Sequence, residues 1–138
     1  SDIVFSSKLL AFLLGKTVSD ALAVRVKGPH SEEEIKVKVD GAGKILKIGK
    51  DVPIADAYGE SIGIELFSSA TAEVLFQTLE KQVRQGIGRT EFYEASFQEL
   101  IDNGRHLHAV DVSDFPSAEI DTLEDLEFVR KSILPRLA

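Results

Sequence analysis

Carboxylates at the ends of predicted strands are the side chains of this sequence best suited to chemistry. Asp2 opens a short apolar run, and Asp121 follows the strand-like segment Ala118–Ile120 near the other end of the chain. Ligands of open α/β sheets bind at the carboxyl edge of the strands. Two acids held together at such an edge would provide the oxygen ligands that Mg²⁺ prefers, with room for substrate phosphates. Asp2 and Asp121 are therefore candidate metal ligands, although their spacing alone does not show that they meet.

The residues after Asp121 predict a helix with a capped start. Thr122 is a favourable N-cap, and Asp125 lies three residues later, where its carboxylate can accept a hydrogen bond from the backbone N–H of Thr122 in a capping box. Glu124 and Asp125 also bring negative charge to the positive end of the helix dipole. Asp121 would then lie just outside the helix, either as a metal ligand or simply as a turn residue, since Asp is common in turns.

Other catalytic patterns are absent or weak in the sequence. The chain has no cysteine, which excludes disulfides and thiol catalysis, and the phosphate loop G-x-x-x-x-G-K-[ST] does not occur. His106 and His108 share one face of a predicted strand and could form a metal-binding pair. No third ligand is spaced near them, so a half-exposed strand face also accounts for these histidines.

Apolar periodicity predicts strands that alternate with helices. The expected strands cover residues 2–5, 21–27, 35–39, 44–50, 61–67 and 106–112, and the expected helices cover 8–14, 69–85, 94–103 and 123–133, the last closed by Pro135. This order predicts an α/β fold with one inserted β-hairpin. The chain shows no internal repeat and no linker, so we expect a single unit over residues 1–138.

Three details of these elements carry specific expectations. The lysines of the hairpin 35–50 alternate with apolar residues and predict a solvated face, with an anion-binding surface as the alternative. Gly63 lies inside a predicted strand, which suggests the close approach of a backbone or a ligand. The helix 69–85 carries an apolar stripe that we expect to face the core, made of Ala72, Leu75, Phe76, Leu79 and Val83.

Composition narrows the class of protein. About 43% of the 138 residues are hydrophobic, which is typical of a folded domain with a core. The formal net charge is −7, and a chain this acidic lacks the basic footprint of a nucleic-acid-binding protein. No apolar run reaches about 18 residues and no leader pattern is found, so we expect a cytoplasmic protein that does not span a membrane. The chain lacks Met, and we expect a trimmed product or the later part of a longer protein.

Five segments recur in the order seen in a known family. They are Ser1-Asp2-Ile3-Val4-Phe5, the strand pair that ends on Lys50, Gly59-Glu60-Ser61-Ile62-Gly63-Ile64, Tyr93-Glu94, and Glu119-Ile120-Asp121-Thr122 with Asp125-Leu126. Together they resemble the second half of Rossmann-like nucleotidyltransferases, which join CTP or another NTP to a phosphorylated small molecule. The chain is most similar to the bacterial cytidylyltransferases for phosphocholine and for 2-aminoethylphosphonate, with the sugar-phosphate nucleotidyltransferases beside them.

The resemblance implies a fold and a set of roles. The fold would be a Rossmann-like mixed sheet with flanking helices and an inserted β-hairpin, incomplete on its N-terminal side. Asp2 and Asp121 would hold Mg²⁺, and Lys50 would face the anionic group of the acceptor as the catalytic lysine. The acceptor would be bound by Glu60, Gly63, Tyr93 and Glu94, and an acid beside an aromatic ring suits an amine or quaternary ammonium group.

The chain also departs from the family pattern. Ala95 stands where the family often has Asp, and Ser61 stands where an aromatic residue is common, so the acceptor is not defined by the resemblance. The nucleotide-binding loop of the family, Leu-x-Ala-Gly-x-Gly-x-Arg, does not occur in these 138 residues. We therefore expect that this polypeptide alone does not catalyse the transfer.

Two hypotheses for the function follow. In the first, the chain is the acceptor- and metal-binding part of a nucleotidyltransferase, with an NTP and a small phosphorylated acceptor as its partners and pyrophosphate as a product. In the second, it is a non-enzymatic domain that binds a small ligand or another protein and has kept only the fold. In either case an incomplete sheet would expose apolar surface, so we expect association with a second copy or with a missing half.

Overall fold

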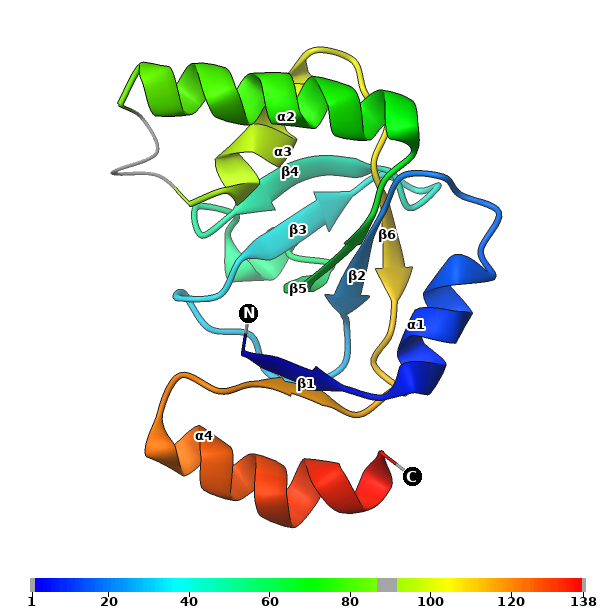
Figure 1. Cartoon of the computed structure of the whole chain (residues 1–138), viewed down its shortest axis with the longest axis vertical. Helices are drawn as coiled ribbons and strands as arrows, with labels where there is room; N and C mark the ends of the chain where they lie inside the picture. The colour runs from blue at the N-terminus through cyan, green and yellow to red at the C-terminus, as the bar shows by residue number, and fades with distance from the viewer. Residues whose placement is uncertain (1, 87–91, 138) are drawn as a thin grey trace.

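A mixed five-stranded sheet forms the centre of the molecule (Figure 1). The computed structural model describes residues 2–86 and 92–137. Within them, the strands lie in the spatial order β4 (Ile45–Gly49), β3 (Lys36–Val39), β5 (Gly59–Leu66), β2 (Ala21–Arg25) and β6 (His108–Asp111). β2 runs parallel to β6, and all other neighbours are antiparallel. The predicted mixed α/β fold with an inserted hairpin, β3–β4, is thereby confirmed.

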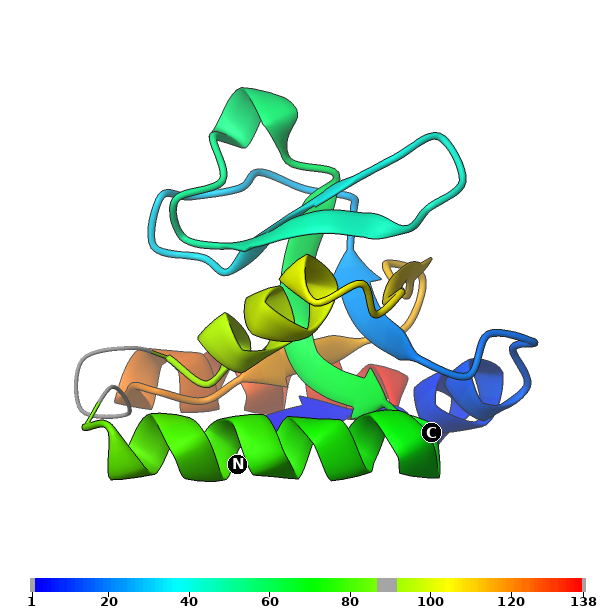
Figure 2. The same cartoon turned by 90° about the horizontal axis from the view of Figure 1, so that it is seen from above.

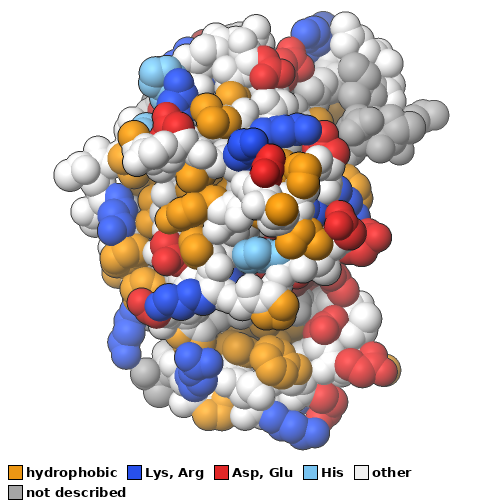
Figure 3. All heavy atoms as spheres, turned by 180° about the vertical axis from the view of Figure 1, so that it is seen from behind, with side chains coloured by type: hydrophobic (Ala, Val, Ile, Leu, Met, Phe, Trp, Pro, Cys, Tyr) orange, Lys and Arg blue, Asp and Glu red, His pale blue; other side chains and the backbone are white. Residues whose placement is uncertain are grey.

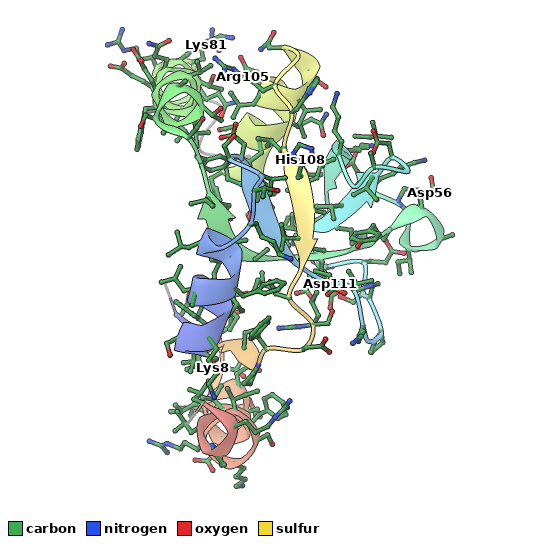
Figure 4. All side chains as sticks on the ribbon, turned by 90° about the vertical axis from the view of Figure 1, so that its right-hand side faces the viewer. Lys8, Asp56, Lys81, Arg105, His108 and Asp111 are labelled. Atoms are coloured by element: carbon green, nitrogen blue, oxygen red, sulfur yellow. The ribbon has the colours of Figure 1, made fainter. Side chains whose placement is uncertain are left out.

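Helices on both sides cover this sheet. They are α1 (Ser7–Leu14), α2 (Ser69–Arg84) and α3 (Glu94–Asp102). α1 and α2 begin at serine caps: the Ser6 hydroxyl accepts from the N–H of Lys8 at 3.2 Å, and the Ser68 hydroxyl accepts from the N–H of Thr71 at 3.3 Å. A short turn, η1 (Ile54–Asp56), follows β4 and projects beside the hairpin, where Figure 4 labels Asp56.

The core lies on both faces of the sheet because successive side chains of a strand point to opposite sides. Leu22 and Val24 of β2 pack toward α2 and α3, whereas Ala21 and Ala23 pack toward α1. The buried partners are Leu75, Phe97 and Leu100 on the first side and Leu9 and Leu13 on the second. The run of apolar residues at the start of β2 therefore does predict a strand buried on both faces.

The two outermost strands of the sheet meet at one end. Lys44, just before β4, pairs with His108 at the start of β6 in an antiparallel bridge. The N–H of Ile45 donates to the carbonyl of Leu107 at 2.8 Å, and the N–H of Ala109 donates to the carbonyl of Gly43 at 3.0 Å. The hairpin therefore curls back over the sheet, as the view from above in Figure 2 shows.

A second, smaller layer lies beneath the sheet in Figure 1. Its two strands, β1 (Ile3–Phe5) and β7 (Ser117–Glu119), are antiparallel and place Ile3 opposite Glu119. The chain then continues through α4 (Leu123–Phe128), the π-helical turn η3 (Val129–Ile133) and the 3₁₀ turn η4 (Leu134–Arg136). We call β1, β7 and residues 123–136 the ribbon unit, and β2–β6 with α1–α3 the sheet unit. Helical turns run on past Pro135, which was expected to end them.

Two expectations about side-chain placement are wrong. Leu75 and Leu79 of α2 pack in the core as predicted, but Phe76 and Val83 are 69% and 70% exposed, so only part of the predicted apolar stripe faces the core. The helix is rotated because polar groups fix its buried face: the Ser96 hydroxyl donates to Gln82 at 2.7 Å, and the Gln82 amide donates to Glu99 at 2.9 Å. Hydrogen bonds between α2 and α3 thus decide the rotation.

Lys36 is the second exception, since it is fully buried instead of lying on a solvated lysine face. Its ammonium group donates to the backbone carbonyls of Ser31, Glu32 and Glu34 at 3.0 to 3.1 Å. Three carbonyl dipoles replace the water that the charge loses on burial. The loop before β3 therefore folds over the strand and is held there by Lys36.

Candidate functional site

A cavity of about 750 Å³ lies between the sheet unit and the ribbon unit. It is lined by parts of β1, β5 and β7, by the loop before β3, by the end of the hairpin and by the start of α3. All seven residues that the sequence singled out line it: Asp2, Lys50, Glu60, Gly63, Tyr93, Glu94 and Asp121. The fold thus brings together residues that are distant in the sequence, while their chemical roles stay predictions.

Pairing of β1 with β7 brings the two candidate metal ligands to one wall of this cavity. The N–H of Ile120 donates to the carbonyl of Asp2 at 3.0 Å, which places Asp121 one residue beyond the strand pair. The N–H groups of Asp121 and Thr122 both donate to the carboxylate of Asp125, at 3.2 and 2.8 Å. The capping box predicted for Thr122 and Asp125 is present and holds the backbone at Asp121.

The charge around these ligands suits a cation. Burial, followed by repulsion from Asp121 and Asp2, raises the pKa of the neighbouring Glu119 carboxyl. Three carboxylates therefore crowd one wall of the cavity, and all three offer oxygen, the donor that Mg²⁺ takes in proteins. The donor type of these residues suits Mg²⁺, but Asp2, Glu119 and Asp121 do not form a group of three close ligand atoms among the described residues, so a Mg²⁺ site here remains a prediction.

Glu94 has a buried carboxylate oxygen that no described residue binds. This first residue of α3 is 8% exposed, and its Oε2 atom is buried without a hydrogen-bond partner among the described residues. Burial is the main cause that raises the pKa of the Glu94 carboxyl. A buried acceptor without a partner costs free energy, which a donor on a bound ligand would recover.

Tyr93 lies beside Glu94 at the mouth of the cavity. Its hydroxyl donates to Glu65 at 3.3 Å, and its ring packs edge-on against Phe97 with centroids 5.4 Å apart. Burial and the two nearby carboxylates raise the pKa of the Tyr93 hydroxyl, so it remains a neutral donor. The ring is therefore fixed in place and presents an aromatic surface next to an acid.

Lys50 contributes the cationic group of the cavity wall. Its ammonium group lies 3.1 Å from Glu33 and 4.6 Å from the ring centroid of Phe92. The Glu33 side chain is 89% exposed, so this ion pair is worth little and can exchange for an anion of a ligand. A second hollow of about 400 Å³ adjoins the first and shares Lys50, Glu94 and Phe92 with it.

Glu60 stands on β5 at the junction of the two units. Its carboxylate lies 3.4 Å from the guanidinium of Arg25, which also donates to the carbonyl and hydroxyl of Ser117 on β7. Burial raises the pKa of the Glu60 carboxyl, while the charge of Arg25 opposes that rise. Arg25 therefore connects the sheet unit to the ribbon unit beside the cavity.

Gly63 is a point of contact between the units. Its φ is +71°, and a Cβ atom there would lie 2.8 Å from the Cδ1 atom of Ile3. The sequence suggested the close approach of a backbone or a ligand, but the atoms near Gly63 belong to the side chains of Ile3 and Tyr93. A side chain at this position would have to adopt a positive φ and displace the Ile3 side chain.

Some lining residues were missed by the sequence reasoning. Glu33 and Glu34 were not singled out, and Glu119 was named only as part of the segment before Asp121. Among the described lining residues, seven carboxylates face a single lysine. Acidic side chains also gather along one edge of the molecule, on the right in Figure 3. The run Glu32-Glu33-Glu34 was the available signal for this charge.

The histidine pair considered as a metal site lies elsewhere. His108 is the first residue of β6 and lies next to the tip of the hairpin, whereas Asp111 ends the same strand (Figure 4). His106 and His108 do not line the large cavity. Among the described residues, the group of side chains close enough to share a metal ion is instead His30, Glu34 and Glu60.

Sheet order and flanking helices define a mixed α/β, Rossmann-like fold. No family model matches the chain, and no curated protein matches it. Among solved structures, the chain is similar to the inositol-1-phosphate CTP transferase from T. maritima, with a TM-score of 0.64 and 20% sequence identity. The match covers 90% of this chain and 48% of that one, so the chain spans about half the length of this neighbour. At this identity the likeness shows a shared fold.

No helix in the described part of the chain combines the length and the apolar character that crossing a bilayer requires.

Proposed function

We propose that this chain is the acceptor- and metal-binding part of a nucleotidyltransferase that couples CTP, or another NTP, to a small phosphorylated or phosphonate acceptor and releases pyrophosphate. One observation carries the proposal. Seven residues chosen from sequence motifs line one cavity, on a fold shared with a solved CTP transferase. The acceptor, the nucleotide and the role of each residue belong to the proposal.

Asp2 and Asp121 are the proposed Mg²⁺ ligands. When bound, the ion would neutralise phosphate charge and so favour attack of the acceptor oxygen on the α-phosphorus. The capping box uses the side chains of Thr122 and Asp125 and leaves that of Asp121 out of the cap. In the proposal, the Asp2 and Asp121 carboxylates bind the ion, and the ion binds the substrate phosphates.

Lys50 is the residue proposed to bind the anionic end of the acceptor. A phosphate or phosphonate would replace Glu33, whose exposed carboxylate is a weak competitor. The ring of Phe92, 4.6 Å from the ammonium group, adds a cation–π contact in the same cavity lining. Positioning of this kind supplies much of the rate in phosphoryl chemistry.

The opposite end of the acceptor is proposed to be cationic. Glu94 supplies a buried carboxylate, Glu60 a half-buried one and Tyr93 an aromatic face in the lining of the same cavity. An ammonium group would gain both ionic and cation–π attraction there. It would also give the orphaned Oε2 atom of Glu94 a partner. The acidic lining therefore favours an amine-bearing acceptor such as phosphocholine or 2-aminoethylphosphonate over a neutral polyol phosphate.

No glycine-rich nucleotide loop occurs in these 138 residues, so we propose that binding and transfer are separable. The chain alone would bind the acceptor and Mg²⁺, and transfer would require a polypeptide that supplies the nucleotide loop. Titration calorimetry with phosphocholine, 2-aminoethylphosphonate and inositol-1-phosphate tests the first part. Release of pyrophosphate from CTP, by this chain and by any longer product of its gene, tests the second.

Variants of the proposed acceptor ligands, with a matched control, show whether acceptor binding uses this cavity. Lys50→Met and Glu94→Gln should each weaken acceptor binding by about tenfold or more, the value of one charge-assisted contact. Lys38→Met is the matched control, because Lys38 pairs with Asp56 away from the cavity. Acceptor binding without pyrophosphate release by any form would favour the alternative, a non-enzymatic ligand-binding domain. No binding of any of the three acceptors would overturn both.

A further inference from the structure

A second cluster of possible metal ligands lies at the edge of the cavity. His30 and Glu34 belong to the segment between β2 and β3, and Glu60 is the second residue of β5. One ligand atom from each residue lies within 4.8 Å of the other two. The Nδ1 atom of His30 is 3.7 Å from an oxygen of Glu34. None of these residues is part of the Asp2 and Asp121 pair.

The state of His30 distinguishes this cluster from an ordinary surface ion pair. The imidazole is 12% exposed, and its Nδ1 atom is buried with no hydrogen-bond partner among the described residues. The carboxylates of Glu34 and Glu60 are 26% and 19% exposed. A buried ring nitrogen that lies near a carboxylate but makes no hydrogen bond is costly unless a ligand completes it.

Surrounding groups hold each of the three side chains. Glu34 accepts a hydrogen bond from the N–H of Ser31 at 2.7 Å, and Glu60 is held by Arg25. Lys36 fixes the backbone of the loop through its three carbonyl contacts. Such outer contacts orient metal ligands and keep their geometry before an ion binds.

We propose that His30, Glu34 and Glu60 bind a transition-metal dication, with Zn²⁺ as the best match, at a site separate from that of Asp2 and Asp121. An imidazole nitrogen with two carboxylates suits Zn²⁺, whereas Mg²⁺ selects oxygen alone. Two ligands about 2.1 Å from one tetrahedral Zn²⁺ lie roughly 3.4 Å apart, close to the spacing of His30 and Glu34. Three protein ligands leave a fourth position that water or an anionic group can fill. With Zn²⁺ on Glu60, the cationic end of the acceptor would be left to Glu94 and Tyr93, which line the same cavity.

The test is a direct Zn²⁺ titration of this chain, by calorimetry and by native mass spectrometry. We expect one bound Zn²⁺ that excess Mg²⁺ does not displace. His30→Ala should weaken binding by about tenfold or more, and Glu34→Gln, which keeps an oxygen for the N–H of Ser31, should do the same. Asp121→Asn and His108→Ala are the matched controls and should change the affinity by less than about twofold.

Imidazole resonances give a readout that does not depend on affinity. Zn²⁺ should shift the signals of His30 and leave those of His106 and His108 in place. Thermal unfolding checks that each variant is folded. Absence of Zn²⁺ binding, unchanged binding in His30→Ala, or loss of binding in Asp121→Asn would each overturn the site. Because no nucleotide or acceptor is present, this outcome is independent of the proposed transferase function.

Discussion

The sheet unit and the ribbon unit form opposite walls of one cavity but differ in how many side chains they bury. The sheet unit has helices on both faces and two clusters of fully buried side chains. The ribbon unit has two strands of three residues each, and its C-terminal helical segment buries only Val129 and Ile133 among the described residues. Leu123, Phe128 and Leu134 of the same segment are exposed.

The proposed acceptor-binding and metal-binding residues stand on different units. Lys50, Tyr93 and Glu94, proposed for the acceptor, stand on the deeply packed unit, whereas Asp2 and Asp121 stand on the thin one. The units touch at Gly63 and through Arg25. Small changes in free energy should therefore move the metal ligands more readily than the acceptor pocket.

Loss of a core side chain in the sheet unit should have the largest effect. Leu22 is fully buried between β2 and the helices α2 and α3, so Leu22→Ala should lower the free energy of unfolding by about 3 kcal/mol. Leu123→Ala in the ribbon unit removes a side chain that is 79% exposed and should change it by less than about 0.5 kcal/mol. Denaturant unfolding of both variants measures the contrast, and equal losses would refute it.

A side chain at Gly63 should break the contact between the units. Gly63→Ala must adopt a positive φ and meets Ile3, so we expect a loss of about 2 kcal/mol and faster amide exchange in β1 than in β2. Gly41→Ala is the control, because nothing lies within 4 Å of its Cβ position and its φ is not positive. If β1 and β2 exchange at wild-type rates in Gly63→Ala, the ribbon does not depend on this contact.

Removal of a helix cap should separate stability from metal binding. Thr122→Ala and Ser68→Ala each delete one side-chain cap and should each cost about 1 kcal/mol. Only Thr122→Ala disturbs the turn that holds Asp121, so only this variant should weaken Mg²⁺ binding, by several-fold. Calorimetric titration with Mg²⁺ decides the point, and equal Mg²⁺ affinities in the two variants would contradict it.

The smallest expected change concerns the pH dependence of stability. Burial raises the pKa of Glu94 above the ordinary 4.5, so its contribution to stability is full below 4.5 and is lost as the pH rises through the higher folded value. Glu94→Gln should therefore melt at a higher temperature than the wild type at pH 7 and at the same temperature at pH 4.

Glu99 provides a control of opposite sign for this prediction. Its hydrogen bonds with Lys81 and Gln82 lower the pKa of its carboxyl, so Glu99→Gln should reduce the melting temperature at pH 7. Thermal scans from pH 4 to pH 8 follow both variants. A Glu94→Gln variant that melts below the wild type at pH 7 would show that its carboxylate already has a stabilising partner.

Local patterns were sufficient to predict most elements of the fold. Period-2 and helical spacing located the hairpin and α3, and the capping box at Thr122 was visible as two residue types three positions apart. The rotation of α2 was not predictable in this way, because hydrogen bonds from Gln82 to α3 outweigh its apolar stripe.

The candidate site shows the same division between local and distant information. Asp2 and Asp121 were found by motif order, yet their meeting depends on a strand pair between the two ends of the chain. His30 and Glu34 meet Glu60 only because the buried Lys36 folds their loop over the sheet. Alternation along β3 predicts an exposed lysine, since periodicity contains no information on what covers a strand.

The meeting of β4 with β6 has a consequence for behaviour in concentrated solution. Outer strands ordinarily present rows of unpaired N–H and C=O groups, which act as templates for aggregation. Here Ile45 and Ala109 use these groups inside the molecule, and further along β4 the N–H of Ile48 donates to Gln98 of α3 at 2.9 Å. This end of the sheet therefore resists strand-by-strand polymerisation, and the self-association expected for the chain would have to use another surface.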